Sequence, residues 1–182
     1  SSSIGIPKSF RFSRQSTKSP VRRSERVELI DYENDRGEGI RAIVNSSGAY
    51  EHATAVVIPP AWGKTKETLL PLAATIVETF ERASEPVFVI RYDGIRKRGE
   101  SYNERECRFP GQEHHRFTFS QGVRDIQATL DLLERPGFRP ARTILVTFSA
   151  AAIEGRRAVA LEPGRISGWI SVVGAADIQS AM

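Results

Sequence analysis

A serine follows an apolar strand and precedes a run of small residues in the segment LVTFSAAA, residues 145–152. A serine on a sharp strand-to-helix turn is the arrangement that presents a nucleophilic hydroxyl for acyl transfer. Strand and helix approach closely there, so the residues two before and two after the serine must be small. Here they are Thr147 and Ala151, in place of the two glycines of the usual Gly-x-Ser-x-Gly pattern. The segment predicts Ser149 as a nucleophile.

The alternative is that Ser149 only caps the helix, because serine is a favoured N-cap residue. Its position favours the catalytic interpretation, since sites in α/β sheets form at the carboxyl ends of strands. A nucleophilic serine also needs a base. The three histidines of the sequence, His52, His114 and His115, all precede Ser149. We therefore expect this chain to lack its catalytic base.

Acyl transfer also requires backbone N–H donors aimed at the developing oxyanion. One donor is usually the residue after the serine, here Ala150, and the second comes from the loop after an earlier strand. That loop is residues 59–63, PPAWG. Its two prolines have no N–H, so Ala61 or Trp62 must donate. Trp62 could instead be a hydrophobic plug over the helix start, and both roles are compatible because the donor is backbone.

The same loop carries a partial phosphate-binding signature, Gly63-Lys64-Thr65. The full signature requires a glycine five residues before Gly63, and Ile58 stands there. The two prolines of the loop also remove N–H groups that would cradle a phosphate. We therefore expect no nucleotide site and no organic cofactor.

Four residues are candidate substrate contacts: Trp62, Phe148, His114 and His115. The two adjacent histidines lie in the polar segment 93–118 and could line the mouth of a cleft. Adjacent histidines make a poor chelate, so we predict no metal site.

Two aspartates follow predicted strands. Asp93 is expected to make structural hydrogen bonds in the floor of the site. Asp177 could orient a catalytic base or cap a helix.

Hydrophobic patterning predicts an α/β sheet. Near-continuous apolar runs indicate strands buried on both faces. The predicted strands are 27–32, 40–44, 54–58, 87–90, 143–146 and 166–173. The predicted helices are one capped by Thr68 and reaching Phe80, one capped by Ser120 and reaching Leu133, 150–161, and one from 175. The first two strands form an antiparallel hairpin, and alternating helices and strands then predict a mostly parallel sheet with helices on both faces.

Composition fits one globular domain and narrows its class. The 182 residues are 40% hydrophobic and 26% charged, which is enough to bury a core. No segment approaches the roughly 20 apolar residues of a membrane span. The single cysteine, Cys107, excludes an internal disulfide and favours a reducing compartment, so we expect a cytoplasmic protein.

The net positive charge of the chain comes from its N-terminal end. Residues 1–26 contain seven Lys or Arg and one acid, whereas residues 27–182 contain 19 basic and 21 acidic residues. Residues 1–25 are also rich in serine and lack apolar periodicity, so we expect a poorly ordered tail or interdomain linker. An arm for nucleic acid or a membrane surface is the weaker alternative. The chain, which starts at Ser1, is expected to be part of a longer protein.

From about residue 25 onward the chain resembles the N-terminal portion of an α/β-hydrolase. Within that superfamily it is similar to the acyl-carrier-protein thioesterases or acyltransferases of bacterial bioluminescence. The resemblance is carried by Arg91-Tyr92-Asp93, residues 117–122 (FTFSQG), Phe148-Ser149-Ala150 and Val172-Val173-Gly174. It implies a partial α/β-hydrolase domain over residues 26–182, from which the C-terminal strands are missing.

The resemblance also implies roles. Ser149 would be acylated by an ester or thioester, one candidate being a fatty acyl thioester of an acyl carrier protein. Ala150, with Ala61 or Trp62, would hold the oxyanion. The acid and histidine of the family lie on later strands, so an oligomer or a further C-terminal part is expected to cover the edge of strand 166–173.

Two rival interpretations stay open. One is a non-catalytic scaffold or binding module with a hydrolase-like fold. The other is a structural domain of a larger synthase, with the basic tail as its linker.

Overall fold

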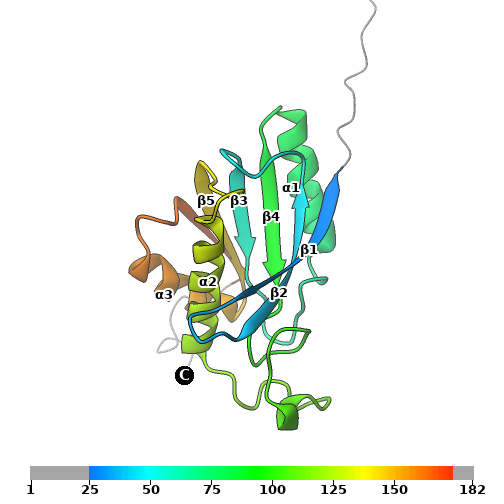
Figure 1. Cartoon of the computed structure of the whole chain (residues 1–182), viewed down its shortest axis with the longest axis vertical. Coiled ribbons are helices and arrows are strands. Elements are labelled where there is room, and N and C mark those ends of the chain that lie inside the picture. The colour runs from blue at the N-terminus through cyan, green and yellow to red at the C-terminus, as the bar shows by residue number, and fades with distance from the viewer. Residues whose placement is uncertain (1–24, 174–182) are drawn as a thin grey trace, which may run out of the picture.

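The computed structural model describes residues 25–173 (Figure 1). Residues 1–24 of the predicted tail, Gly174, Asp177 and the helix predicted from residue 175 lie outside the described residues.

The described residues form one six-stranded sheet with the strand order β1-β2-β4-β3-β5-β6. The strands are β1 (Arg26–Glu33), β2 (Gly39–Ser46), β3 (Thr54–Ile58), β4 (Val87–Tyr92), β5 (Arg142–Phe148) and β6 (Gly168–Val172). β2 runs antiparallel to both β1 and β4, whereas β4, β3, β5 and β6 run parallel to one another. The predicted mostly parallel sheet with an N-terminal antiparallel hairpin is confirmed.

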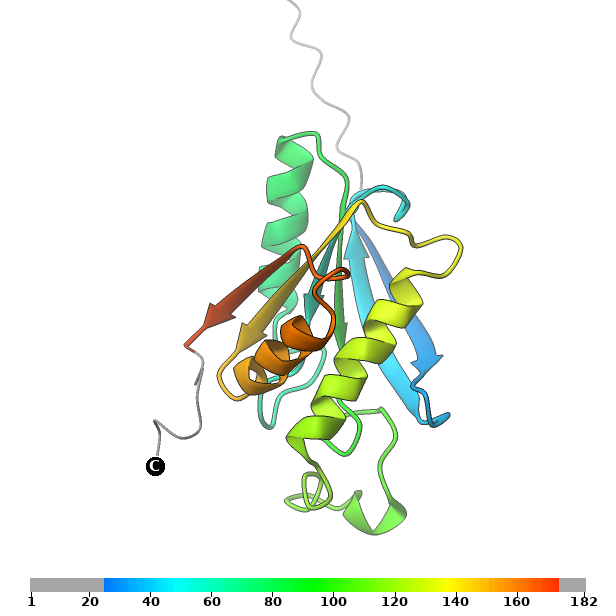
Figure 2. The same cartoon turned by 90° about the vertical axis from the view of Figure 1, so that its left-hand side faces the viewer.

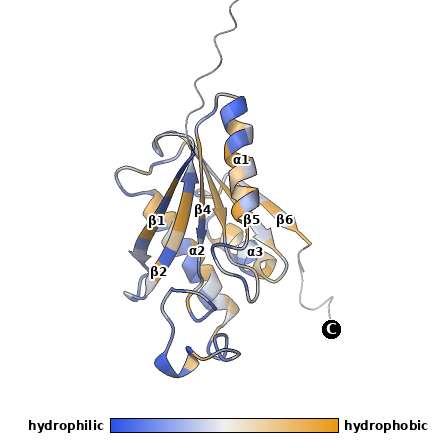
Figure 3. Cartoon of the chain, turned by 90° about the vertical axis from the view of Figure 1, so that its right-hand side faces the viewer, coloured by the Kyte–Doolittle hydropathy of each residue, from blue (hydrophilic) through white to orange (hydrophobic). Residues whose placement is uncertain are grey.

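Within residues 25–173, three α-helices cover the two faces of this sheet. They are α1 (Leu70–Arg82), α2 (Phe119–Leu133) and α3 (Ala151–Leu161), and a short 3-10 helix spans Arg105–Cys107. Figure 2 shows α2 and α3 side by side on one face, and Figure 3 shows α1 on the other. This is the layering that parallel strands joined by helices impose, because each crossover must return over one face of the sheet.

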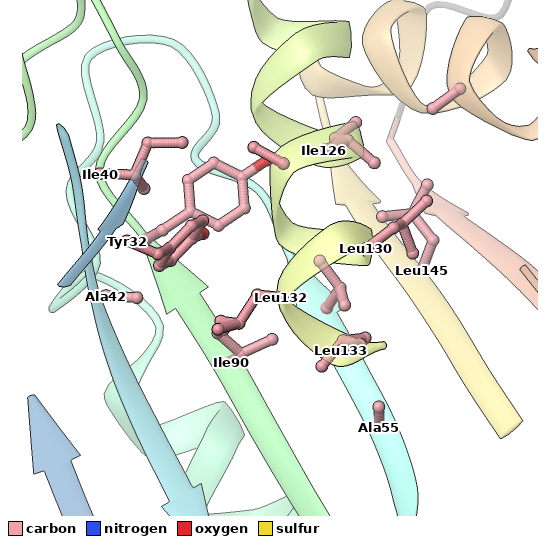
Figure 4. Close-up of a cluster of buried hydrophobic side chains, with 14 of the residues drawn as sticks. Tyr32, Ile40, Ala42, Ala55, Ile90, Ile126, Leu130, Leu132, Leu133 and Leu145 are labelled. Atoms are coloured by element: carbon pink, nitrogen blue, oxygen red, sulfur yellow. The ribbon is translucent and has the colours of Figure 1, made fainter. Parts of the chain in front are cut away.

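The larger part of the core lies under α2 (Figure 4). Ile126, Leu130 and Leu133 of α2 pack against strand residues such as Ile90 and Leu145, and all five are buried. These helix positions recur at helical spacing, which places them on one face. A smaller cluster under α1 includes Ala73 and Val77 of the helix. Both faces of β3 and β4 are therefore covered, in keeping with their apolar runs.

The two predicted helix caps are wrong by one or two residues. Thr118, not Ser120, is the N-cap of α2, and its side chain accepts a hydrogen bond from the N–H of Gln121 at 3.2 Å. Leu69, not Thr68, precedes α1, and the Thr68 hydroxyl instead accepts from the N–H of Thr65 at 3.2 Å. Thr118 fits because its backbone is extended, as an N-cap requires.

β6 is shorter than the predicted strand 166–173 and lies at one edge of the described sheet. Ile170 and Val173 are 52% and 92% exposed there. Cys107 is buried and unpaired. None of the helices within residues 25–173 has the length and hydropathy that a membrane crossing requires.

Candidate active site

Ser149 lies on a strained turn between β5 and α3. β5 ends at Phe148 and α3 begins at Ala151, with Ala150 as its N-cap and no side-chain capping bond. The interpretation of Ser149 as a helix cap is therefore wrong. Its φ of +52° is in the left-handed region, which costs a non-glycine residue about 1–2 kcal/mol. The Ser149 side chain is exposed, and its N–H donates to the Val172 carbonyl of β6 at 3.2 Å.

Gly155, one turn into α3, leaves space for the side chain of Thr147, the residue two positions before the serine. A Cβ at Gly155 would lie 2.6 Å from Cγ2 of Thr147. The hydroxyl of this threonine accepts a hydrogen bond from Nε1 of Trp169 at 2.9 Å, which fixes its rotamer. Ala151 is buried in the same contact zone. The glycine of the usual pattern is thus replaced by a glycine on the facing helix.

A cavity of about 260 Å³ opens beside Ser149. Its walls come from the end of β3, the loop after it, the start of α1 and the end of β5. Its lining includes Pro59, Pro60, Ala61, Leu69, Phe148 and Ser149. These groups are mostly apolar, which suits a hydrocarbon ligand. A larger hollow of about 380 Å³ lies at the opposite end of β5, and none of the predicted site residues line it.

Of the predicted oxyanion donors, Ala61 lines this cavity, whereas Ala150 and Trp62 are not among its lining residues. Ala150 directly follows Ser149, and Ala61 lines the cavity with it. Within residues 25–173 no backbone hydrogen bond is donated by Ala61, Trp62 or Ala150. The next N–H, that of Gly63, donates instead to Nε2 of His114 at 3.3 Å.

Trp62, in the loop of residues 59–63, contacts His114. The two rings stack with centroids 4.5 Å apart, and Phe117 meets the edge of Trp62 at 5.7 Å. Trp62 is nevertheless 53% exposed. His115, the other histidine of the predicted pair, is exposed, as is His52 before β3. The structure therefore brings His114, but not His115, into contact with the loop of residues 59–63.

His114 makes this contact pH-sensitive. Burial, and then the nearby charge of Lys97, lower the pKa of His114 from its ordinary 6.5. The neutral ring is the form whose Nε2 can accept the Gly63 N–H. Because the folded pKa lies below the unfolded one, this contribution to stability is complete above about pH 6.5 and is lost as pH falls below it.

We expect the fluorescence of Trp62, measured in a Trp169→Phe background, to change with a midpoint below pH 6.5. A protonated imidazole stacked on the indole quenches it. The change should vanish in a matched His114→Gln variant. A midpoint at or above pH 6.5, or the same transition without His114, would contradict this assignment.

Asp93 makes the structural hydrogen bonds expected of it. This buried carboxylate, just after β4, accepts from the N–H of Lys66 at 2.8 Å, from Nζ of Lys66 at 2.9 Å and from the N–H of Glu100 at 2.8 Å. It therefore anchors the chain before α1, where Lys66 and Leu69 line the cavity.

Two charged residues beside the site escaped the sequence analysis. Lys97 and Glu154 form an ion pair of 2.8 Å, and both side chains are only 2% exposed. Nζ of Lys97 also donates to the Pro60 carbonyl at 3.3 Å and lies 4.3 Å from the centre of the Phe117 ring. The one available signal was an acid on the otherwise small, inward face of α3, between Ala151 and Ala158. Within residues 25–173 no group of three or more His, Cys, Asp or Glu is arranged to hold a metal.

Comparison with solved structures places this arrangement in a known fold. The α/β hydrolase GrgF from Penicillium sp. sh18 is 16% identical with a TM-score of 0.65, over 82% of this chain and 46% of that one. Est1E from Butyrivibrio proteoclasticus with ferulic acid bound is 18% identical with a TM-score of 0.64, over 84% and 55%. A thioesterase domain from the curacin biosynthetic pathway is 18% identical with a TM-score of 0.54, over 86% and 50%.

No family model and no curated protein matches the sequence. The chain spans about half the length of these three solved structures. The finer resemblance to the bioluminescence thioesterases or acyltransferases stays a prediction. The strand order, the helix layers and the solved neighbours agree, and this chain has the fold of the α/β-hydrolase superfamily.

Proposed function

We propose that this protein is a serine acyl hydrolase or acyltransferase, an esterase or acyl thioesterase, which acts through an acyl-Ser149 intermediate. The observation that carries the proposal is the left-handed backbone of Ser149, with φ +52°, on an exposed turn at the carboxyl end of β5. Strained backbone of this kind is retained mainly at functional sites. The helix N-cap beside it is Ala150, so the strain serves no capping bond.

The chemistry follows the usual course of serine acyl transfer. The Ser149 hydroxyl oxygen forms a bond to the acyl carbonyl carbon, and its proton passes to a base. The bond from that carbon to the leaving sulfur or oxygen then breaks, and the base returns the proton to the leaving group. Water or another acceptor attacks the acyl-serine in the same way and frees the enzyme. Ala150 and a residue of the 59–63 loop donate to the oxyanion in both steps.

The base and its acid are expected on strands that follow the strand predicted over residues 166–173. The cavity beside Ser149 supports an apolar acyl group as substrate. An acyl thioester, with an acyl carrier protein as its donor, is the substrate class that we favour. The single buried Cys107 supports a reducing compartment such as the cytoplasm.

A non-catalytic scaffold is the second candidate. The observation that favours it is the apolar surface of Ile170 and Val173 at the β6 edge, which a partner or a further part of the chain would cover.

Turnover of acyl thioesters by the complete gene product tests the proposal. Ser149→Ala is expected to lower kcat about a thousandfold or more on both short and long acyl chains, because the nucleophile is gone. Ser84→Ala is the matched control, since Ser84 is an exposed serine with a φ of +58° at the end of α1, far from the cavity lining. Undiminished turnover in Ser149→Ala would exclude the serine mechanism and favour the scaffold.

A further inference from the structure

We infer that Lys97 is a positioning residue that orients the peptide group between Pro60 and Ala61, so that the N–H of Ala61 becomes the second oxyanion donor. The inference rests on the proposed function and deepens it. It selects Ala61 over Trp62, and it gives a role to the buried Lys97–Glu154 pair.

The peptide group between Pro60 and Ala61 is held on its carbonyl side. A trans peptide is planar, so its C=O and N–H point in opposite directions. Nζ of Lys97 holds the Pro60 carbonyl at 3.3 Å. Holding that oxygen therefore aims the Ala61 N–H away from Lys97. Lys97 is paired to Glu154 of α3. Figures 2 and 3 show α3 and α1 on opposite faces of the sheet. Ala61 lines the cavity, which reaches Leu69 at the start of α1.

The N–H of Trp62 is the less suitable second donor. The N–H of Trp62 belongs to the next peptide group, whose oxygen is the Ala61 carbonyl. That carbonyl accepts from the N–H of Lys64 at 3.1 Å in the local turn. The Trp62 ring is occupied with His114 and Phe117. Ala61 lines the cavity together with Ser149, whereas Trp62 is not among its lining residues, and the assignment of the second donor to Ala61 follows from this.

The side chain of Lys97 is held in place by its neighbours. Glu154 pairs with it at 2.8 Å, and Phe117 covers the ammonium group. A Cβ at Gly94 would lie 2.7 Å from Cδ of Lys97, and one at Gly122 would lie 2.3 Å from the carboxyl carbon of Glu154. These two glycines make the space in which the pair fits. The pair is thus closely packed against the loop after β4 and against α2.

The Lys97–Glu154 pair connects the two segments that carry the oxyanion donors. Glu154 belongs to α3, the helix that begins just after Ala150, so Lys97 connects the helix of the first donor to the loop of the second. The positive charge of the Lys97 ammonium group, which donates to the Pro60 carbonyl oxygen, also polarises this peptide group and strengthens its N–H as a donor. Such aimed dipoles matter most where charge develops in the transition state. Within residues 25–173 the second carboxylate oxygen of Glu154, Oε2, has no hydrogen-bond partner. A buried charge pair with an unsatisfied oxygen is not the arrangement expected for stability alone.

The test uses Lys97→Met/Glu154→Met in the complete gene product, because replacing both buried charges by apolar groups tends to preserve stability. We expect kcat for acyl thioesters to fall about ten- to a hundredfold, with KM unchanged within about twofold, since only the transition state loses a donor. The affinity of a boronic acid, which forms a tetrahedral adduct with serine, should fall in parallel. The 15N-labelled amide of Ala61 should shift in the NMR spectrum.

The matched control is Arg96→Met/Glu38→Met, which removes a partly buried pair of 2.6 Å that does not contact residues 59–63. It should leave kcat and boronic acid affinity unchanged. If the first double variant does not fold, Lys97→Gln/Glu154→Gln keeps a hydrogen-bonded pair without charge and should lower kcat less, by about three- to tenfold.

If kcat and boronic acid affinity are unchanged in a folded variant and Ser149 is still acylated in the parent, the role of Lys97 is overturned, but the proposed function is not. A parent protein that never acylates Ser149 would overturn the proposed function and the inference with it. An Ala61 amide that does not shift would contradict the hold on the peptide whatever the outcome at Ser149.

Discussion

Ser149→Gly is expected to stabilise the fold by about 1–2 kcal/mol while abolishing acyl transfer. The φ of +52° at this position is costly for serine and nearly free for glycine. The side chain is exposed, so its removal sacrifices little packing. The free energy of unfolding in urea and the turnover of an acyl thioester measure the two effects on the same samples. Opposite signs of stability and activity are expected where strain is kept for function.

Two variants separate strain from chemistry. Ser149→Ala removes the nucleophile but keeps a Cβ, so it should lose activity without the gain in stability. Ser84→Gly relieves the same kind of strain, at a φ of +58°, and should gain stability with full activity. A Ser149→Gly variant that is less stable than the parent would show that the backbone there is not strained.

Lys97→Met alone is expected to lower the free energy of unfolding by about 3–5 kcal/mol, the second large effect. The substitution leaves Glu154 2% exposed without its counterion. Lys97→Met/Glu154→Met should recover most of that loss, because no buried charge remains. Thermal and urea unfolding of the two variants and the parent measure the difference.

The penalty in Lys97→Met should also depend on pH. Burial raises the pKa of Glu154, and Lys97 opposes that rise. Without Lys97 the folded state favours the neutral carboxyl even more strongly. A raised folded pKa means that stability is retained at low pH and lost as pH rises, so the penalty should shrink toward pH 4 and grow toward neutrality. A loss that is equal at all pH values would contradict an unpaired buried charge as its cause.

The apolar runs of the sequence were sufficient to predict the central strands of the sheet. Residues 54–58 and 87–90 were predicted as buried strands from their apolar runs, and β3 and β4 cover them. Such runs are informative because strands buried on both faces have no polar positions. The caps of α1 and α2 were misplaced, because several threonines and serines precede each helix and only the backbone decides which of them accepts a bond.

The site was predictable only in part. Ser149 and the 59–63 loop were expected together, since parallel strands bring their carboxyl ends to one edge, and Ala61 and Ser149 do line one cavity. The choice between a capping and a strained Ser149 depends on φ, which residue types do not encode. Lys97 and Glu154 are 57 residues apart, and their contact arises from the packing of α3 against the loop after β4.

Mass spectrometry of the complete gene product, quenched during turnover of an acyl thioester, tests the central claim most directly. The account predicts a mass increase equal to the acyl group, mapped to the peptide that contains Ser149 and absent from Ser149→Ala. Turnover with an unmodified Ser149, or with the acyl group on another residue, would contradict it.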